Sequence, residues 1–452
     1  MLKRTGLVIL GMAMLGCFTS TFVSAQSHDE TPMQLSGYSF SEAFEIPDDQ
    51  LLAPNSRTLK QMLYRVKKTS HKSRHEYAEF SQSVTWEQIL QETPDYRMWV
   101  FDRAARLTKI QKHSFADASS DEEISGFFVC HCVHDDPETG KEIPFIAIAR
   151  SVPKRLFKQT APEQVRVTGF LFNRVSNEDF IKPVFVVDRL GWFPDATSEL
   201  ASPSQIQLSK LGVDIGEYDY VPTNNKRGLS KRDAEAFYQT IAAVSSNDQP
   251  LLESDETLGF RQLMGKSNSN FGNRVRVQGV VRTCSKVHVT DPDIRNRLGL
   301  STYYQLIVFP NMDGRTITLN NADGENLVYR RFPITVCIPK LPNGMMPSDL
   351  ERKEFEVEGF FFRFWKYKAD KTDSANIAGQ ISPLIIGQTP TLLVTTEQGL
   401  LNQVILGFAA IVLAGLATII FCYRYADRKH KQAKDSILNE LPEQIDIPYV
   451  PE

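Results

Sequence analysis

Two segments of the chain share one pattern: Val165-Arg166-Val167-Thr168-Gly169-Phe170-Leu171-Phe172 and Phe355-Glu356-Val357-Glu358-Gly359-Phe360-Phe361-Phe362. Apolar and polar residues alternate up to a glycine, and an apolar run follows the glycine. Alternation with a period of two residues is typical of a β-strand. A glycine inside such a strand allows a sharp bend or the close approach of another backbone. The sequence therefore predicts two bent strands in two similar domains.

The similarity extends on both sides of these strands. Tyr64 and Trp86 are 22 positions apart, and Tyr238 and Phe260 are separated by the same interval. Apolar runs are flanked by prolines nine positions apart in both halves, at Pro144 and Pro153 and at Pro333 and Pro342. Repeated spacing of this kind indicates an internal repeat, which sets the number and register of the domains.

Each copy is expected to contain helices followed by five strands. Ser56 and Ser230 are placed to cap the first helix of each copy. The apolar stripe of this helix comprises Leu59, Met62, Leu63 and Val66 in the first copy and Ala234, Phe237, Ile241 and Val244 in the second. A second short segment follows at 85–90 and has its counterpart at 259–264. Strands are predicted at 98–101, 127–130, 145–148, 165–172 and 184–187, and at 275–281, 304–308, 334–338, 355–362 and 384–386.

The second copy also contains an insertion, about Thr316 to Arg331. It follows a turn, Asn311-Met312-Asp313-Gly314, whose counterpart in the first copy is the turn that begins at Asp135-Asp136-Pro137. We therefore expect the insertion to form an extra hairpin or loop outside the repeated strands.

Two apolar segments indicate how the chain is placed relative to a membrane. The first of them lies at the N-terminus. Lys3 and Arg4 precede a short apolar core, and Val23-Ser24-Ala25 ends it with small residues. This arrangement is typical of a cleaved signal peptide, predicted here at 1–25, with an N-terminal linker at 26–43. Lipid attachment at Cys17 is the alternative that the sequence leaves open.

The second apolar segment, Val404 to Cys422, contains 19 residues without a charge. As a helix it covers roughly the 30 Å hydrocarbon core of a bilayer. A transmembrane helix is therefore predicted at 400–423, after a juxtamembrane linker at 389–399. The basic residues that follow predict that the tail at 424–452 is cytoplasmic; they are Arg424, Arg428, Lys429, Lys431 and Lys434.

The predicted fold class is mainly β with flanking helices (α+β). Three strands, a short connection and two more strands form an order that resembles the OB-fold, a five-stranded Greek-key barrel. Val165 to Gly169, Val275 to Gly279 and Phe355 to Gly359 carry this resemblance. It covers roughly residues 96–190 and 273–388 and implies two tandem five-stranded OB-like barrels plus one C-terminal transmembrane helix.

The first copy departs from the OB-fold pattern in one respect. Arg103 lies where its first strand would carry a glycine. A small β-sandwich with the same number of strands is therefore the alternative fold. The domain boundaries follow from the repeat: copy one at 44–190, a linker at 191–217, and copy two at 218–388.

Cys130, Cys132 and His134 form the cluster that most resembles a ligand site. Alternate residues of a strand share one face, and thiolate and imidazole groups suit zinc or copper. The corresponding positions of the second copy hold no such ligands, so the fold does not depend on a metal there; they are Leu306, Val308 and Pro310. Burial in a core is therefore the preferred interpretation, and no metal site is predicted. The four cysteines Cys130, Cys132, Cys284 and Cys337 leave three disulfide connectivities open.

The net charge is −3 over 452 residues, which argues against a nucleic-acid partner. The sequence contains no Gly-x-Ser-x-Gly, His-Glu-x-x-His or glycine-rich phosphate motif. We therefore predict that the protein is not an enzyme and has no catalytic residues and no cofactor.

The whole layout is similar to uncharacterised membrane-anchored envelope proteins of planctomycete bacteria. The paired Gly-Phe-Phe-Phe-type strands and the tyrosine-bearing helix before each barrel carry this resemblance, which implies no activity. The predicted function is a single-pass protein of the cytoplasmic membrane with a duplicated periplasmic ectodomain that binds or scaffolds an envelope protein, peptide or glycan. A metal-binding or redox protein using Cys130, Cys132 and His134 is the alternative. Homo-oligomerisation through exposed apolar faces of the fourth strands is also left open.

Overall fold

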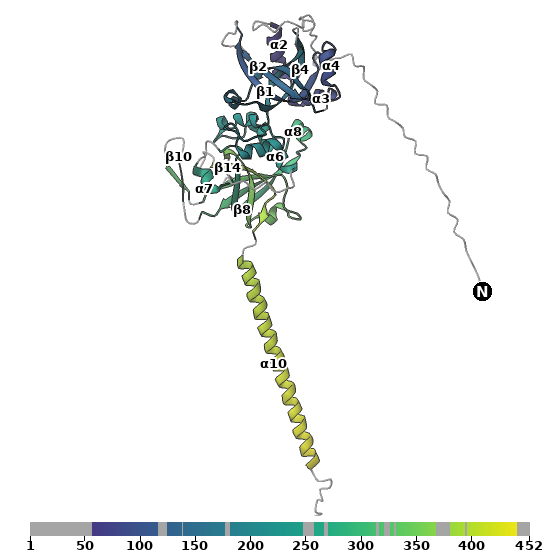
Figure 1. Cartoon of the computed structure of the whole chain (residues 1–452). Helices are drawn as coiled ribbons and strands as arrows, with labels where there is room; N and C mark the ends of the chain where they lie inside the picture. Colours follow the sequence, from purple (N-terminus) through teal and green to yellow (C-terminus); the bar gives the residue numbers. More distant parts are fainter. Residues whose placement is uncertain are drawn as a thin grey trace, which may run out of the picture.

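The structure, a computed structural model, describes residues 57–115, 124–137, 139–176, 181–246, 257–265, 270–312, 316–320, 326–329, 331–367, 380–393 and 396–440. Several predictions lie outside these residues: the signal peptide, Cys17, the linker at 26–43, the cap at Ser56 and the end of the tail after residue 440. The described residues form a mixed α+β structure with two main sheets and a long C-terminal helix (Figure 1).

The first sheet has six strands in the order β1-β2-β3-β5-β4-β6, and β1 also pairs with β4. All pairs are antiparallel except β3 with β5. A short helical turn, η1 (Lys154–Lys158), connects β3 to β4. The strands are β1 (Val100–Ser114), β2 (Gly126–Asp135), β3 (Glu142–Ser151), β4 (Glu163–Ser176), β5 (Ile181–Arg189) and β6 (Gly191–Trp192).

The second sheet has seven strands in the order β15-β13-β14-β12-β9-β8-β7, and β13 also pairs with β8. β12 and β14 are parallel, as β3 and β5 are in the first sheet. The strands are β7 (Leu258–Gly259), β8 (Arg274–His288), β9 (Thr302–Pro310), β12 (Ile334–Ile338), β13 (Glu354–Tyr367), β14 (Gln380–Gly387) and β15 (Thr391–Leu392). The predicted insertion forms a separate hairpin of β10 (Ile317–Asn320) and β11 (Asn326–Tyr329), which confirms the expected extra hairpin.

Gly169 and Gly359 occupy matching places in the two sheets. Gly169 lies opposite Val187, Gly359 lies opposite Gly387, and each strand has an irregularity two residues later. A Cβ atom on either glycine would overlap the carbonyl oxygen of a neighbouring strand. The close approach of another backbone, which the sequence pattern predicted, is therefore the reason for both glycines.

In each module, a helix packs on the outer face of the sheet, over the third and fifth strands of the repeat. α2 (Arg57–Lys68) packs on β5 and β3, and α6 (Lys231–Ser246) packs on β14 and β12. The four predicted stripe residues of α2 are fully buried, and three of the four stripe residues of α6 are buried. An apolar stripe on one face of a helix packs against the core in this way because burial removes it from water. The aromatic residues of the fourth strands are also buried, so the exposed apolar faces suggested for oligomerisation are not present there; they are Phe170, Phe172, Phe360 and Phe362.

Smaller helices complete the two halves. The short segments predicted at 85–90 and 259–264 are found as α4 (Trp86–Gln91) and α7 (Phe260–Gly265). The others are α3 (His71–Phe80), α8 (Pro292–Leu298) and α9 (Pro347–Leu350). We call the first sheet with α2–α4 and η1 module one, and the second sheet with α6–α9 and the β10–β11 hairpin module two.

The segment 191–217, expected to link the two copies, is folded and packed. It contains β6, α5 (Pro203–Lys210) and the first part of η2 (Ile215–Asp219), and η3 (Pro222–Asn224) follows. Leu208, Val213 and Ile215 are fully buried in a hydrophobic cluster that includes residues of both modules. α3 of module one also contacts α8 of module two.

The last element, α10 (Thr396–Glu440), is a continuous helix of 45 residues. Its segment Gln403–Ser436 is the one described helix long and apolar enough to cross a membrane, and none of its most apolar part is buried. Because a helix rises 1.5 Å per residue, α10 is about twice as long as a hydrocarbon core is thick. Module two lies between module one and this helix (Figure 1).

Candidate functional site

The predicted cysteine–histidine cluster lies on β2, with its two cysteines in the interior of module one and His134 only half-buried. Cys130 and Cys132 are 0% and 1% exposed and belong to the main hydrophobic cluster. His134 lies near the end of the same strand, with its ring 5.0 Å from the ring of Trp86. Trp86 in turn packs 5.3 Å from the buried Phe145. The three predicted residues are thus packed among aromatic and apolar side chains.

This environment makes the cluster a poor ligand set. Burial raises the pKa of both the Cys130 and the Cys132 thiol above the usual range, so the thiolate that binds metals is disfavoured. His134 Nδ1 donates to the carbonyl oxygen of Ala104 at 2.7 Å. In the part of the chain that the structure describes, no three His, Cys, Asp or Glu side chains are grouped to hold a metal ion. The geometry favours packing over the metal-binding alternative.

The other two ectodomain cysteines are also buried. Cys284 lies on β8 and Cys337 on β12, and both are free thiols, as are Cys130 and Cys132. Burial raises the pKa of Cys284 to about 11 and that of Cys337 above its usual range. None of the three disulfide connectivities left open is formed among these four residues.

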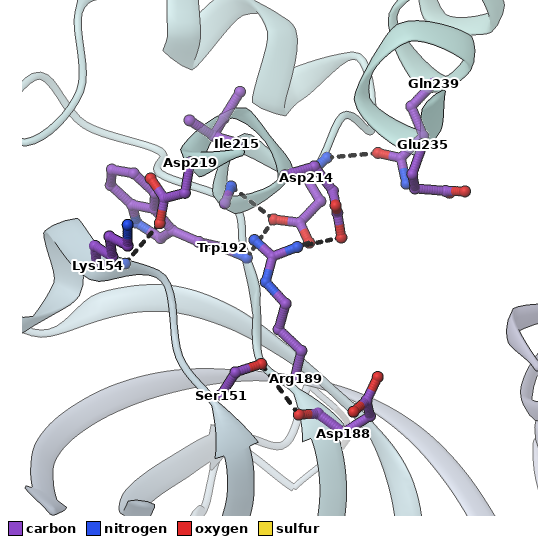
Figure 2. A network of polar contacts seen from close by, with 12 residues as sticks. Ser151, Lys154, Asp188, Arg189, Trp192, Asp214, Ile215, Asp219, Glu235 and Gln239 are labelled. Carbon is purple, nitrogen blue, oxygen red and sulfur yellow. Dashed lines mark hydrogen bonds and ion pairs between the residues drawn. The ribbon is translucent and has the colours of Figure 1, made fainter. Parts of the chain in front are cut away.

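A network of buried charges lies between the two modules, and no sequence motif indicated it. At its centre, Arg189 at the end of β5 lies 3.8 Å from Asp214 (Figure 2). Arg189 also contacts Glu217. These three side chains are only 11–13% exposed. One oxygen of Asp214 accepts hydrogen bonds from the backbone N–H groups of Trp192 and Gly216, both at 2.8 Å. A guanidinium of module one thus meets two carboxylates of the connecting segment.

The network continues into module two through α6. The backbone N–H of Asp214 donates to the Gln239 side chain at 3.0 Å, and Gln239 donates to Glu235 at 2.8 Å. Both oxygens of Glu235 accept from Arg297 of α8, each at 2.8 Å. A chain of polar contacts therefore runs from β5 through η2 to α6 and α8.

The network also continues into module one through Asp188, the neighbour of Arg189. Asp188 is 2.6 Å from Arg150 of β3 and 3.4 Å from Arg74 of α3. The Arg74 side chain is only 8% exposed, so its charge depends on this carboxylate. We call the seven side chains Arg74, Asp188, Arg189, Asp214, Glu217, Glu235 and Arg297 the junction network.

A second cationic contact joins η1 to the connecting segment. Arg155 lies 3.6 Å from Asp219 and 4.5 Å from the ring centroid of the fully buried Trp192. The backbone N–H of Lys154 donates to Asp219 at 2.6 Å, and Arg155 donates to Gln205 at 2.8 Å. Because a guanidinium over an indole face is attracted by the ring, these contacts hold the segment against module one.

Burial changes the protonation of the junction carboxylates. Removal from water raises the pKa of Glu217 to about 8 against the attraction of Arg189, and Asp214 and Glu235 raise it further by repulsion. Removal from water also raises the pKa of Asp214. The two carboxyl groups thus share one cause of their raised pKa values, which is removal of the charged form from water, and Arg189 opposes it in both.

Buried ion pairs add little net stability, but removing one partner is costly, because the other charge stays buried without compensation. The junction network joins module one, the connecting segment and module two through such buried contacts. Its members are scattered from residue 74 to residue 297, so no local motif in the sequence groups them.

No protein-family model matches the chain, and a search of curated proteins finds no match.

Proposed function

We propose that this is a single-pass membrane-anchored envelope protein whose two-module ectodomain binds or scaffolds another envelope component without catalysing a reaction. The observation that carries the proposal is the junction network, which holds two similar modules in one orientation on a single membrane helix. Two modules on one rigid base present two surfaces at a set spacing, and such an arrangement strengthens binding to an extended or repeated partner.

We further propose that both modules are OB-like barrels that arose by duplication. The support is the strand order 1-2-3-5-4, with strand 1 also pairing to strand 4 and with strands 3 and 5 parallel, in both modules. The matching glycines and the matching covering helices support the same proposal. An OB-like fold does not by itself name a ligand, because one fold serves many functions.

The proposed orientation has the ectodomain on the periplasmic side and the tail in the cytoplasm. Its support is the segment after the apolar part of α10, where Arg424, Arg428, Lys429 and Lys431 are opposed by Asp427 alone. The signal-like N-terminus agrees with this orientation. Digestion of intact cells and of inverted vesicles with a protease tests it: the modules should be cleaved only in intact cells with a permeabilised outer layer.

The binding function is tested with the full-length protein in lipid nanodiscs. We expect it to sediment with insoluble cell-wall material or to co-purify with a reproducible envelope protein. An Arg189→Met variant should lose much of this retention, because the junction network loses its central cation and the orientation of the modules is less restricted. Arg166→Met is the matched control, since Arg166 is an exposed cation paired with Asp102 within module one. Absence of any wild-type retention would contradict the proposal.

A further inference from the structure

Ionic contacts hold module one to η2. Arg189 of β5 contacts Glu217 and lies 3.8 Å from Asp214, the residue that precedes η2. Arg155 of η1 lies 3.6 Å from Asp219, at the end of η2. The strength of these guanidinium–carboxylate pairs depends on whether the carboxyl groups are charged. The boundary between module one and η2 is therefore sensitive to protonation.

Neutral contacts join η2 to module two. Tyr218 is buried, and its ring lies 5.8 Å from that of Phe362 on β13. Its hydroxyl shares a hydrogen bond of 2.8 Å with Thr240 on α6. The backbone N–H of Asp214 donates to Gln239 of the same helix. A change in the charge of the acidic residues in and before η2 therefore acts mainly on the boundary with module one.

Carboxylates outnumber guanidiniums in the junction network and the ion pairs that continue it. None of these side chains is more than 29% exposed. The six carboxylates are Asp188, Asp214, Glu217, Asp219, Glu235 and Asp293, and the five guanidiniums are Arg74, Arg150, Arg155, Arg189 and Arg297. With every group ionised, the cluster carries one negative charge in excess. Because uncompensated charge is costly away from water, such a cluster favours holding one proton.

Glu217 is the member best placed to hold that proton. Its side chain is the least exposed of the six carboxylates, at 11%, and Arg189 is its one hydrogen-bond donor among the described residues. Asp214 shares that guanidinium but also accepts from the backbone N–H groups of Trp192 and Gly216, which stabilise its charged form. Removal from water raises the pKa of Glu217 to about 8, in agreement with this assignment.

Charged side chains face Glu217 from several elements. Arg189 of β5 and Arg74 of α3 attract its charged form, whereas Asp214 and Glu235 of α6 repel it. β6 and η3 contain no ionisable residue, and α5 contains an exposed lysine at its end. The ionisable groups farther out are Arg155 of η1, Asp188 of β5, Asp219 and Tyr220 at the end of η2, His71 of α3 and Arg297 of α8.

We infer that the junction is a pH-sensitive contact, in which module one is held on η2 while Glu217 carries a proton and is released locally when that proton is lost. Ionisation leaves an excess negative charge at this boundary, and water must reach the carboxylate to offset it. The boundary between Arg189 and η2 then opens, while the contacts of η2 with module two remain. The inference goes beyond the proposed binding function and does not require it.

His71 sets the lower limit of the pH interval in which the junction responds. Removal from water and the nearby Arg74 lower the pKa of His71 from 6.5, so its protonation below pH 6.5 also favours an open junction. The pKa of Glu217 is raised from 4.5 to about 8, so a rise in pH between these values favours opening. Asp214, whose pKa burial also raises, acts in the same direction as Glu217. The effect of Glu217 is therefore opposed by His71 below pH 6.5 and unopposed from there to about pH 8.

The size of the response follows from the proton that opening releases. In the unopposed interval, the ratio of open to closed junctions rises by up to about tenfold per pH unit. The rise from pH 6.5 to 8 is therefore about thirtyfold. Above this interval the carboxyl group is ionised in both states, so the ratio should stay level.

Hydrogen exchange of the full-length protein in lipid nanodiscs measures this ratio, after correction for the intrinsic effect of pH on exchange. The informative amides are those of Trp192 and Lys154, because they donate from module one to Asp214 and Asp219. Amides in the core strands β3 and β12 report on unfolding of the modules themselves.

Two variants separate the inferred group from carboxylates in general. Glu217→Gln removes the titrating group at nearly the same size. Glu142→Gln is the matched control, since the Glu142 side chain is 69% exposed and paired with Arg106 within module one. Core protection shows whether each variant is folded, and if Glu217→Gln is not, the junction and core profiles of the natural protein decide.

We expect the protection of the junction amides to fall by about thirtyfold from pH 6.5 to 8 in the natural protein and in Glu142→Gln, with core protection unchanged. Glu217→Gln should remove most of this fall. Constant protection at the junction, an equal fall in the core strands, or a fall that persists in folded Glu217→Gln overturns the inference.

Discussion

The change Arg189→Met removes the cation at the centre of the junction network. Arg189 contacts Glu217 and lies 3.8 Å from Asp214, and its side chain is only 12% exposed. Removing one partner of a buried ion pair typically costs 3–5 kcal/mol, because the other charge stays buried without compensation. Since the pKa of Glu217 is raised to about 8, that group is mostly protonated at pH 7. Burial raises the pKa of Asp214 as well, so protonation relieves part of the cost and we expect a loss at the lower end of this range, about 3 kcal/mol.

The loss should depend on pH in a defined direction. Without the guanidinium, the pKa values of Asp214 and Glu217 rise further, so the folded variant takes up protons that the unfolded chain does not hold. The free energy of unfolding then falls as pH rises through the interval between the unfolded and folded pKa values. We therefore expect the difference between Arg189→Met and the natural protein to be small near pH 5 and largest near pH 9.

Urea unfolding of the full-length protein, followed by tryptophan fluorescence, measures this difference. Trp192 is fully buried and its backbone N–H donates to Asp214, so it reports on the junction directly. Arg166→Met is the control, because Arg166 is 55% exposed on its side chain and exposed pairs contribute about 0–1 kcal/mol. Equal losses in the two variants, or a loss at Arg189 that does not change with pH, would refute the reasoning.

Three further changes test other parts of the structure. The pKa of Glu217 is raised from 4.5 to about 8, so the folded protein holds a proton between these pH values that the unfolded chain has lost, and the free energy of unfolding falls as pH rises. Glu217→Gln should make this fall smaller between about pH 4.5 and 8. An unchanged slope in urea titrations would contradict this expectation. Gly359→Ala should destabilise module two by about 1–3 kcal/mol through overlap with a carbonyl oxygen. Gly228→Ala, where no atom lies within 4 Å of the added Cβ, should change the midpoint of thermal unfolding little, and equal shifts would speak against the overlap. Cys130 and Cys132 should react with a thiol reagent only after denaturation, and elemental analysis should find no stoichiometric zinc, copper or iron; either bound metal or fast reaction would revive the metal or redox alternative.

The repeated strands were accessible to sequence reasoning because their signals are local. An alternating run such as 275–281 predicts a strand wherever it lies, and β8 was found there with extensions at both ends. The prediction at 334–338 has the same limits as β12. The strands of module one are longer than predicted, since β1 continues to Ser114 through a polar stretch that has no apolar alternation. Pairing with β2 and β4 stabilises that stretch, and pairing partners are not visible in a local pattern.

The interpretation of Cys130 and Cys132 was limited in a similar way. The two-residue period of a strand places these residues on one face. It does not predict whether that face lines a cleft or packs in the core. The answer depends on Trp86 and Phe145, which come from other elements and fill the space beside His134. Packing of this kind is a property of the assembled module.

The sequence by itself determined three features of this protein. They are a segment long and apolar enough for a membrane helix, two similar sets of strands, and the glycines at which strands approach closely. Each of these depends on composition or spacing within a short stretch of chain. Only the tertiary structure decided that 191–217 is a packed connection and that Arg189 meets Asp214 and Glu217. Charges scattered over the sequence acquire partners, and shifted pKa values, only when folding brings them together and removes them from water.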